Sequence, residues 1–211
     1  MSVIDKFDRL ASGFSAREYG DPARYAARRA RAAVELGPPL SAGATVLDLA
    51  CGDGIMAEPL LALGLRYRGV DGSAAMVVEA RSRLGDQVPF EVGTLEAYEP
   101  PEPVDMTICL RTIYSLEDPR PVFERIAGYT RVKFVFDFDP RAGDRDRIVR
   151  DLRSSGFGDV VLRPFLLPQR VALPSPLRAA LYGLERIGPL ARAALRVRGI
   201  WFCAATPSAG R

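Results

Sequence analysis

Short apolar segments alternate with helix-like segments along most of this chain. Apolar runs rich in β-branched and aromatic residues predict strands at residues 45–50, 66–70, 90–92, 104–110, 132–138, 160–166 and 199–205. Capping residues and apolar positions at helical spacing predict helices at residues 21–36, 55–63, 73–84, 118–127 and 144–155. Strands and helices that alternate in this way indicate an α/β fold.

The segment 45–71 carries the most informative pattern. Its first strand contains one carboxylate, Asp48, and leads into Cys51-Gly52-Asp53-Gly54, where two glycines permit a sharp turn and the close approach of a ligand. A short helix then ends at Gly64, and a second strand ends in Asp71. This succession is typical of the nucleotide-binding half of a Rossmann-like sheet.

Spacing separates three cofactors that such a turn can hold. A dinucleotide fingerprint in register on Gly52 requires a third glycine where the chain has Ile55, and a P-loop requires a lysine that is missing. The pattern that is present resembles motif I of the class I S-adenosylmethionine-dependent methyltransferases, with alanine in place of the first glycine. Its positions are held by Asp48, Ala50, Gly52 and Gly54. The resemblance continues through residues 69–81 and covers about residues 46–139.

The resemblance implies a Rossmann-like, seven-stranded, mostly parallel sheet with helices on both faces and a C-terminal antiparallel β-hairpin. Residues 168–198 would form a helical insertion within that hairpin, and residues 1–40 a helical cap before the first strand. The 211 residues would make one methyltransferase domain, since the chain shows no repeat and no linker.

The resemblance also assigns roles at an S-adenosylmethionine site. Asp71 would accept hydrogen bonds from the ribose hydroxyls, and Met76 would pack on the adenine or serve only as helix core. Thr94 stands where many relatives place an aspartate for the adenine amino group. Tyr19 and Arg24 would reach the methionine end from the cap, and the acid of motif I would organise the turn. The expected cofactor residues are Asp48, Ala50, Cys51, Gly52, Gly54, Asp71, Gly72, Met76, Thr94, Leu95, Leu110, Arg111 and Tyr19.

The ends of the fourth and fifth predicted strands are the expected acceptor side. By resemblance, Leu110 and Arg111 would run beneath the methionine moiety. Tyr114 follows them, where it can orient a nucleophile or merely pack. Asp137 and Asp139 share a face by alternation, and Asp139 lies at the carboxyl end of its strand. Asp139 can act as a base, bind a substrate cation, or simply cap the next turn.

Composition limits the available chemistry. The chain has no histidine, which excludes a histidine-based triad, a HExxH zinc site and an imidazole base, and no metal site is expected. Three cysteines, at positions 51, 109 and 203, are too few for a disulfide framework and are expected as buried thiols. No apolar run reaches the roughly 18 residues of a membrane span. The first residues lack a signal-peptide core, so the expected location is cytoplasmic.

Two regions outside the motif also give expectations. Residues 1–16 predict a short helix or arm with one apolar face, formed by Ile4, Phe7, Leu10 and Ala11. Asp21 and Pro22 open the helix that follows. Its arginines, at positions 24, 28, 29 and 31, are expected to form a solvated face in part.

Positive charge is concentrated late in the chain. Residues 160–200 hold seven arginines and one acid, but the net charge of the whole chain is only +3, too modest by itself to indicate either nucleic acid or anionic lipid. Ser175 is expected to cap a helix that runs to about Ile187, with a second short helix to about Val197. The apolar stripe of the first helix is Leu177, Leu181 and Leu184. Such a helix can pack on the sheet, cover an apolar substrate as a lid, or make peripheral contact with a membrane.

These patterns together predict a methyltransferase that uses S-adenosylmethionine and acts on a small-molecule acceptor. A non-catalytic scaffold that binds S-adenosylmethionine and holds a partner with its basic insertion is the alternative. A nicotinamide-dependent enzyme is disfavoured by Ala50 and Ile55.

Overall fold

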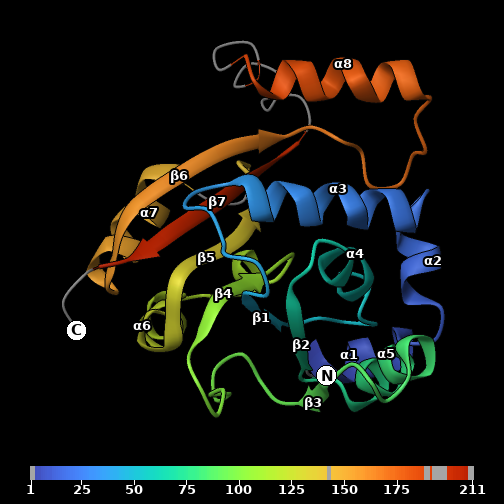
Figure 1. Ribbon diagram of the computed structural model, residues 1–211, viewed down its shortest axis with the longest axis horizontal. Coiled ribbons are helices and arrows are strands. Elements are labelled where there is room, and N and C mark those ends of the chain that lie inside the picture. Colours follow the sequence, from blue (N-terminus) through green and yellow to red (C-terminus); the bar gives the residue numbers. More distant parts are fainter. Residues whose placement is uncertain (1–2, 142–143, 188–190, 192–198, 209–211) are drawn as a thin grey trace.

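Seven strands form one twisted sheet in the computed structural model, which describes residues 3–141, 144–187, 191 and 199–208 (Figure 1). The strands are β1 (Thr45–Leu49), β2 (Arg66–Asp71), β3 (Phe90–Val92), β4 (Val104–Cys109), β5 (Thr130–Phe138), β6 (Phe157–Phe165) and β7 (Ile200–Pro207). Their order is β3-β2-β1-β4-β5-β7-β6, with parallel pairing from β3 to β5. Strand β7 is antiparallel to β5 and β6. The predicted Rossmann-like sheet and its C-terminal hairpin are confirmed.

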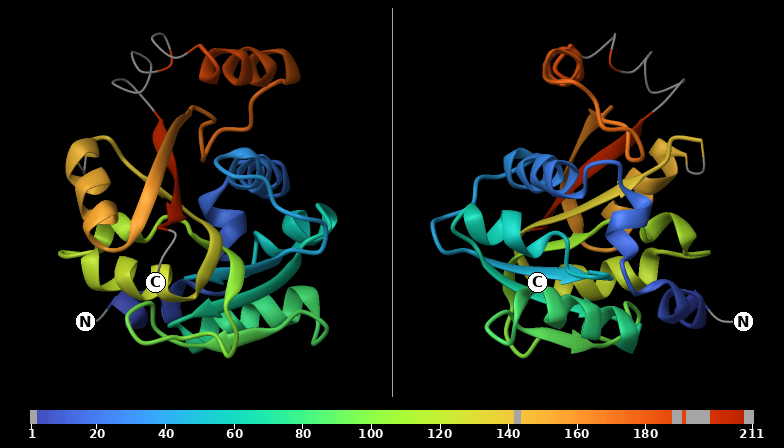
Figure 2. Two further views of the ribbon diagram at one scale, coloured as in Figure 1. Left: turned by 60° about the vertical axis from the view of Figure 1, so that its left-hand side comes forward. Right: turned by 90° about the vertical axis from the view of Figure 1, so that its right-hand side faces the viewer.

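Helices cover both faces of the sheet (Figure 2). They are α1 (Val3–Leu10), α2 (Phe14–Glu18), α3 (Pro22–Glu35), α4 (Ala57–Ala62), α5 (Ala74–Leu84), α6 (Arg120–Tyr129), α7 (Arg145–Ser154) and α8 (Ser175–Glu185), with a 3₁₀ turn η1 (Ile113–Ser115). On one face, α3, α4 and α5 bury Tyr25, Leu60 and Val77 in a common apolar cluster. On the other, Phe123 of α6 and Leu152 of α7 are buried in a second cluster.

Local sequence signals set most helix ends. Asp21 accepts the Arg24 N–H at 3.2 Å, and the Ser73 hydroxyl accepts the Met76 N–H at 3.1 Å, so both predicted N-caps are confirmed. Gly64, with φ 78°, follows α4 and closes it with the paired hydrogen bonds of a Schellman motif. Helix α4 is shorter than the predicted 55–63, because the turn after β1 continues as far as Met56, the residue before the helix.

A buried lysine joins α3 to the sheet. Lys133 on β5 is 0% exposed, and its ammonium donates to the carbonyls of Val34 at 2.6 Å and Leu36 at 2.8 Å. These carbonyls belong to the end of α3, where helix acceptors lack partners and a cation is favoured. Burial lowers the pKa of Lys133 to about 8. The helix is thereby fixed along the sheet.

The N-terminal segment differs from a single amphipathic helix. It breaks between α1 and α2 at Gly13, which has φ 61°. Ala11 is buried, but Ile4 and Leu10 remain 38% and 36% exposed, and no residue of α1 is buried. Ile4 instead lies over Gly72, where an added Cβ would come within 3.3 Å of the Ile4 side chain.

Helix α8 lies above α3 in each view of the ribbon, and its Leu181 and Leu184 pack against the second apolar cluster. It begins after Pro174, so Ser175 is its first residue rather than its cap. The Ser175 hydroxyl accepts a hydrogen bond from the Arg178 guanidinium at 2.9 Å instead. The second helix predicted near residues 188–197 lies outside the described residues. Among the helices that are described, none is long and apolar enough to cross a membrane.

Candidate functional site

The glycine turn after β1 has two different sides. Ala50 and Gly52 have φ 57° and Gly54 has φ 71°, all in the left-handed region. A Cβ at Gly54 would lie 2.9 Å from the Phe90 ring, so only glycine fits against it. A Cβ at Gly52 would meet nothing within 4 Å. The turn therefore packs tightly on the Gly54 side and leaves room for a ligand at Gly52.

Asp71, at the end of β2, connects this turn to the helix that follows. One carboxylate oxygen accepts the Gly52 N–H at 2.7 Å, and the other accepts the Ser73 N–H at 2.8 Å. Each oxygen keeps a second acceptor position, so two ligand hydroxyls can still donate to this carboxylate. Burial raises the pKa of Asp71, and the two N–H donors oppose that effect.

Asp48 lies beneath the turn and is 2% exposed. Its carboxylate accepts the Tyr67 hydroxyl at 2.8 Å. Burial raises the pKa of Asp48 to about 7, although Tyr67 and Arg29 favour the ionised form. A buried, paired side chain at this place suits the predicted role of organising the turn.

Three carboxylates hold α1 and α2 over the turn and over α5. Asp53, which is 3% exposed, accepts the Ser15 backbone N–H at 3.0 Å and the Ser15 hydroxyl at 2.7 Å. Glu79 accepts a backbone N–H from the α1–α2 turn at 3.1 Å, and Asp8 accepts the Ser73 hydroxyl at 2.6 Å. Sequence reasoning missed these contacts, because the paired residues are 38 to 66 positions apart.

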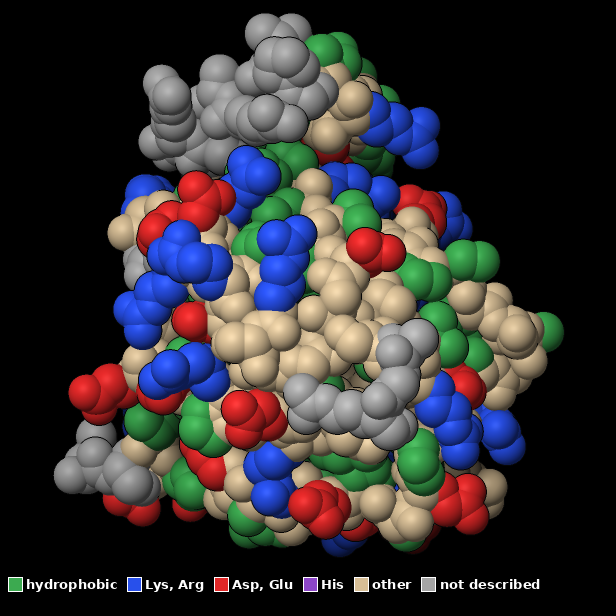
Figure 3. Space-filling model, turned by 90° about the vertical axis from the view of Figure 1, so that its left-hand side faces the viewer, with side chains coloured by type: hydrophobic (Ala, Val, Ile, Leu, Met, Phe, Trp, Pro, Cys, Tyr) green, Lys and Arg blue, Asp and Glu red, His purple; other side chains and the backbone are tan. Residues whose placement is uncertain are grey.

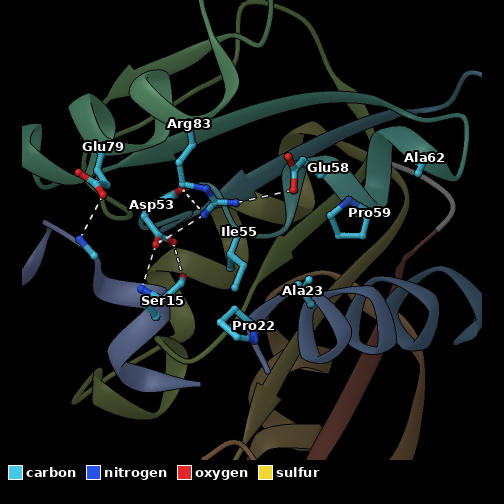
Figure 4. Close-up of a pocket in the computed structure, with 13 residues that line it drawn as sticks. Ser15, Pro22, Ala23, Asp53, Ile55, Glu58, Pro59, Ala62, Glu79 and Arg83 are labelled. Carbon is cyan, nitrogen blue, oxygen red and sulfur yellow. Dashed lines mark hydrogen bonds and ion pairs between the residues drawn. The ribbon is translucent and has the colours of Figure 1, made fainter. Parts of the chain in front are cut away.

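A cavity of about 480 Å³ lies beside these contacts, between α2 and α3 on one side and α4 and α5 on the other (Figure 4). Arg83 reaches across its edge, 3.6 Å from the Asp53 carboxylate and 3.9 Å from that of Glu58. Small and apolar residues form much of the wall: Ala16, Pro22, Ala23, Ala26, Ile55, Pro59 and Ala62. Neither Asp71 nor Arg111 lines this cavity, so it is separate from the predicted cofactor residues.

Asp137 organises the neighbouring ends of β4 and β5. Arg111 has φ 66°, unusual for a residue with a side chain, and its backbone N–H donates to the Asp137 carboxylate. The buried Arg29 guanidinium pairs with the same carboxylate. Burial alone would lower the pKa of Arg29, but Asp137 raises it above its usual value. The Arg111 guanidinium donates to the Tyr19 hydroxyl at 3.1 Å.

This arrangement confirms one expectation about α3 and corrects another. Its arginines form a solvated face in part, since Arg24 and Arg31 are exposed, whereas Arg29 is buried on Asp137 and Arg28 pairs with Glu185 of α8. Arg24 does not point to the strand ends. Its side chain is 67% exposed, pairs with Asp21 at 3.4 Å, and lines a groove between α3 and α8.

A second cavity, of about 360 Å³, opens at the same strand ends. Its lining is mostly aromatic and aliphatic, with a few polar groups: Tyr25, Arg111, Tyr114, Asp137, Phe138, Asp139, Arg141, Phe165, Leu166, Leu167, Pro168, Gln169, Gly199 and Ile200. Asp137 and Asp139 both face it, as the strand alternation predicts. Arg141 donates to Asp139 at 2.8 and 2.9 Å and lowers the pKa of that carboxylate. Tyr114 is 48% exposed.

The other predicted residues are distributed around the turn. Met76 is 1% exposed, which favours the helix-core alternative over an open adenine-stacking surface. Thr94 and Leu95 lie half-buried just after β3. Leu110 and Cys51 are buried at the ends of β4 and β1. All three cysteines are free and buried, and burial raises the pKa of each thiol.

Comparison with known proteins places this geometry in a family. Residues 46–132 match the family described as "Methyltransferase domain". A ubiquinone biosynthesis O-methyltransferase of Pseudomonas putida is 37% identical over 97 residues, which are 44% of this chain and 41% of that protein. The match thus spans about two fifths of the curated relative.

Solved structures extend the likeness over the fold. A putative methyltransferase of Haloferax volcanii, in complex with the Trm112 methyltransferase activator, aligns with a TM-score of 0.70 at 20% identity, over 100% of this chain and 99% of that one. Magnesium protoporphyrin IX methyltransferase of Synechocystis, with bound S-adenosylmethionine, gives 0.60 at 19% identity, over 99% and 85%. The family match over residues 46–132 and the shared fold together support a class I S-adenosylmethionine-dependent methyltransferase.

S-adenosylmethionine is the cofactor of this class, and the residues present fit it. The open space at Gly52 admits a ligand against the backbone, and Asp71 keeps acceptor positions for ribose hydroxyls. Its negative charge disfavours a 2′-phosphate. The methionine end would then lie toward Arg111 and Tyr19, next to the 360 Å³ cavity.

Proposed function

We propose that this methyltransferase acts on a small, largely apolar acceptor bound in the 360 Å³ cavity at the ends of β4 and β5. The observation that carries the proposal is the lining of that cavity, in which aromatic and aliphatic side chains surround a few polar groups. Cavities of this size and character typically hold small molecules. The cavity shares Arg111 with the predicted cofactor site, so an acceptor there would lie beside the methionine end.

We infer that the methyl group is transferred to the oxygen of a hydroxyl group on the acceptor. The similarity to an O-methyltransferase supports this choice. S-adenosylmethionine supplies an activated methyl group, so the protein must mainly position the acceptor and receive its proton. With that cofactor bound, the acceptor oxygen would bond to the methyl carbon as the carbon–sulfur bond breaks.

Asp139 is the residue that we assign to the hydroxyl proton. It lies in the cavity lining, and it is ionised at neutral pH because an aspartate is ordinarily so and Arg141 lowers the pKa of its carboxyl further. An ionised carboxylate can accept the hydrogen bond of the hydroxyl and orient its oxygen toward the methyl group. Tyr114, at the rim of the same cavity, is assigned to acceptor packing.

The test uses methyl-labelled S-adenosylmethionine and a panel of phenols and catechols with and without alkyl tails. Asp139→Asn should lower kcat about 100-fold or more on the best acceptor, the usual effect of removing a proton acceptor. Arg141→Met keeps the carboxylate but removes the group that lowers its pKa, so the acid limb of the pH–rate profile should move to higher pH. Full kcat in Asp139→Asn would remove this residue from the mechanism, and no labelled product from any acceptor would contradict the acceptor class.

A further inference from the structure

The outward surface of α8 is uncharged although it faces solvent. Helical spacing places Pro176, Ala180 and Gly183 of α8 on one strip, and all three are exposed, as is Ile187, which lies two residues after the helix ends. Leu177, beside this strip, is 54% exposed and Ile187 is 50% exposed. An exposed helix normally turns charged residues to water, so an apolar outer strip indicates that something else covers it.

The neighbouring side of α8 borders a strongly basic groove, and Gly183 lies at the edge shared by the strip and the groove. A cavity of about 750 Å³ separates α8 from α3, and its lining includes six arginines and two glutamates. The arginines are Arg24, Arg28, Arg31, Arg163, Arg178 and Arg186. Both glutamates are already engaged, Glu185 by Arg28 and Glu35 by Arg163 at 3.5 Å. Four arginines therefore remain without a glutamate of the groove to balance them.

The remaining charges are available to an anion. Within the described part of the chain, Arg31 and Arg186 form no ion pair with a carboxylate. Arg178 donates only to neutral oxygens, the Leu173 carbonyl and the Ser175 hydroxyl. Arg163 lies near the positive Arg28 and the negative Glu35 and Glu185. Burial and Arg28 lower its pKa. An anionic surface would relieve this excess.

Apolar side chains and arginines lie together at this end of the molecule. In Figure 3, hydrophobic side chains lie at the top, with Lys and Arg side chains just beneath them (Figure 3). The segment that leads into α8 adds Val171, which is 49% exposed, and Arg170, whose side chain is 72% exposed. An apolar strip flanked by arginines is the pattern of a helix that lies in the interface of a membrane.

We propose that α8 and the α3–α8 groove dock this protein on an anionic lipid surface. The apolar strip would enter the region between headgroups and acyl chains, while the arginines contact lipid phosphates. Nucleic acid would match the arginines but not the exposed Leu177 and Ile187.

The docking surface is connected to the acceptor cavity. Glu185, near the end of α8, accepts the Leu166 backbone N–H at 2.8 Å, and Leu166 lines the 360 Å³ cavity. A protein docked through α8 would therefore hold this cavity close to the bilayer, where an apolar acceptor is concentrated. This last step rests on the proposed function, whereas docking itself does not.

Flotation with lipid vesicles tests the docking. Full-length protein should float with vesicles of 70% phosphatidylcholine and 30% phosphatidylglycerol at low salt, and weakly with phosphatidylcholine alone. Each arginine removed should lower partitioning about fivefold, so Arg31→Glu with Arg186→Glu should lower it at least about 25-fold. Leu177→Gln with Ile187→Gln should also weaken binding, including the part that survives 0.5 M salt.

Matched variants separate docking from general effects. Arg150→Glu with Arg153→Glu makes the same charge change on exposed positions of α7 and should leave flotation near wild type. Val78→Gln with Val92→Gln, at positions 65% and 58% exposed, is the control for the apolar pair. Circular dichroism melting confirms that each variant is folded.

Three results would overturn the proposal. The first is wild-type protein that fails to float with anionic vesicles, and the second is groove variants that float as well as their controls. The third result is single-stranded RNA that binds the groove with an affinity unchanged by Leu177→Gln with Ile187→Gln. The flotation readout needs no turnover, so a failure of the proposed function would leave it intact. Conversely, groove variants should retain turnover on a water-soluble acceptor.

Discussion

The two ends of the sheet differ in how their contacts are built. At the β1–β3 end, the glycine turn and Asp71 are joined by contacts over about 20 positions of sequence, as in the Gly52–Asp71 hydrogen bond between residues 19 apart. At the β5–β7 end, contacts join distant segments. Arg29 and Asp137 are 108 positions apart, and Arg28 and Glu185 are 157 apart. The glycine turn and its Asp71 partner are thus encoded locally, whereas the α1–α2 contacts over that turn and the acceptor geometry depend on distant parts of the chain.

The largest effect is expected from breaking the long-range end. Arg29→Met leaves Asp137 buried without its counter-charge and should lower the free energy of unfolding by about 3–5 kcal/mol. Arg31→Met, on the exposed side of the same helix, should change it by no more than about 0.5 kcal/mol. Urea unfolding measures both. Equal midpoints for the two variants would show that the buried pair does not support the fold.

The local end should respond to pH through Asp48. Its pKa of about 7 in the folded chain exceeds the value of about 3.9 expected when unfolded. The folded state therefore holds a proton that the unfolded state loses, so the stabilising contribution is complete below about pH 4 and is lost as pH rises through 7. Relative to Asp48→Asn, the wild type should lose up to about 4 kcal/mol over that window. Parallel pH profiles in urea unfolding would contradict the raised pKa.

A smaller and more specific effect is expected at Asp71. Asp71→Ala removes hydrogen bonds to a charged acceptor and should weaken S-adenosylhomocysteine binding by about 1.5–3 kcal/mol. Asp86→Ala changes an exposed acid beyond the far end of α5 and should leave the affinity unchanged. Titration calorimetry on both variants decides the matter. Wild-type affinity in Asp71→Ala would remove this residue from the cofactor site.

The same contrast explains what could be predicted from the sequence. Strands, caps and the glycine turn were predictable because their signals, such as Ser73 and Gly64, act within a few residues. The Asp53–Ser15 hydrogen bonds and the burial of Arg29 could not be predicted. In a sequence, a carboxylate or an arginine gives no sign of whether its partner is water or a residue far along the chain. Helix α8 was placed correctly in sequence, but its exposed apolar strip needed the three-dimensional arrangement.

The shared carboxylate of Asp137 has a consequence for chain connectivity. It joins Arg29 of α3 and the backbone of Arg111 after β4, so one side chain closes both a long and a short loop. The entropy of loop closure grows only with the logarithm of length, about 0.6 kcal/mol for each doubling. Extra residues in the surface turns between α3 and β5 therefore add little to the entropic cost of bringing Arg29, Arg111 and Asp137 together. The chain can lengthen at those turns while these three residues hold the strand ends in place.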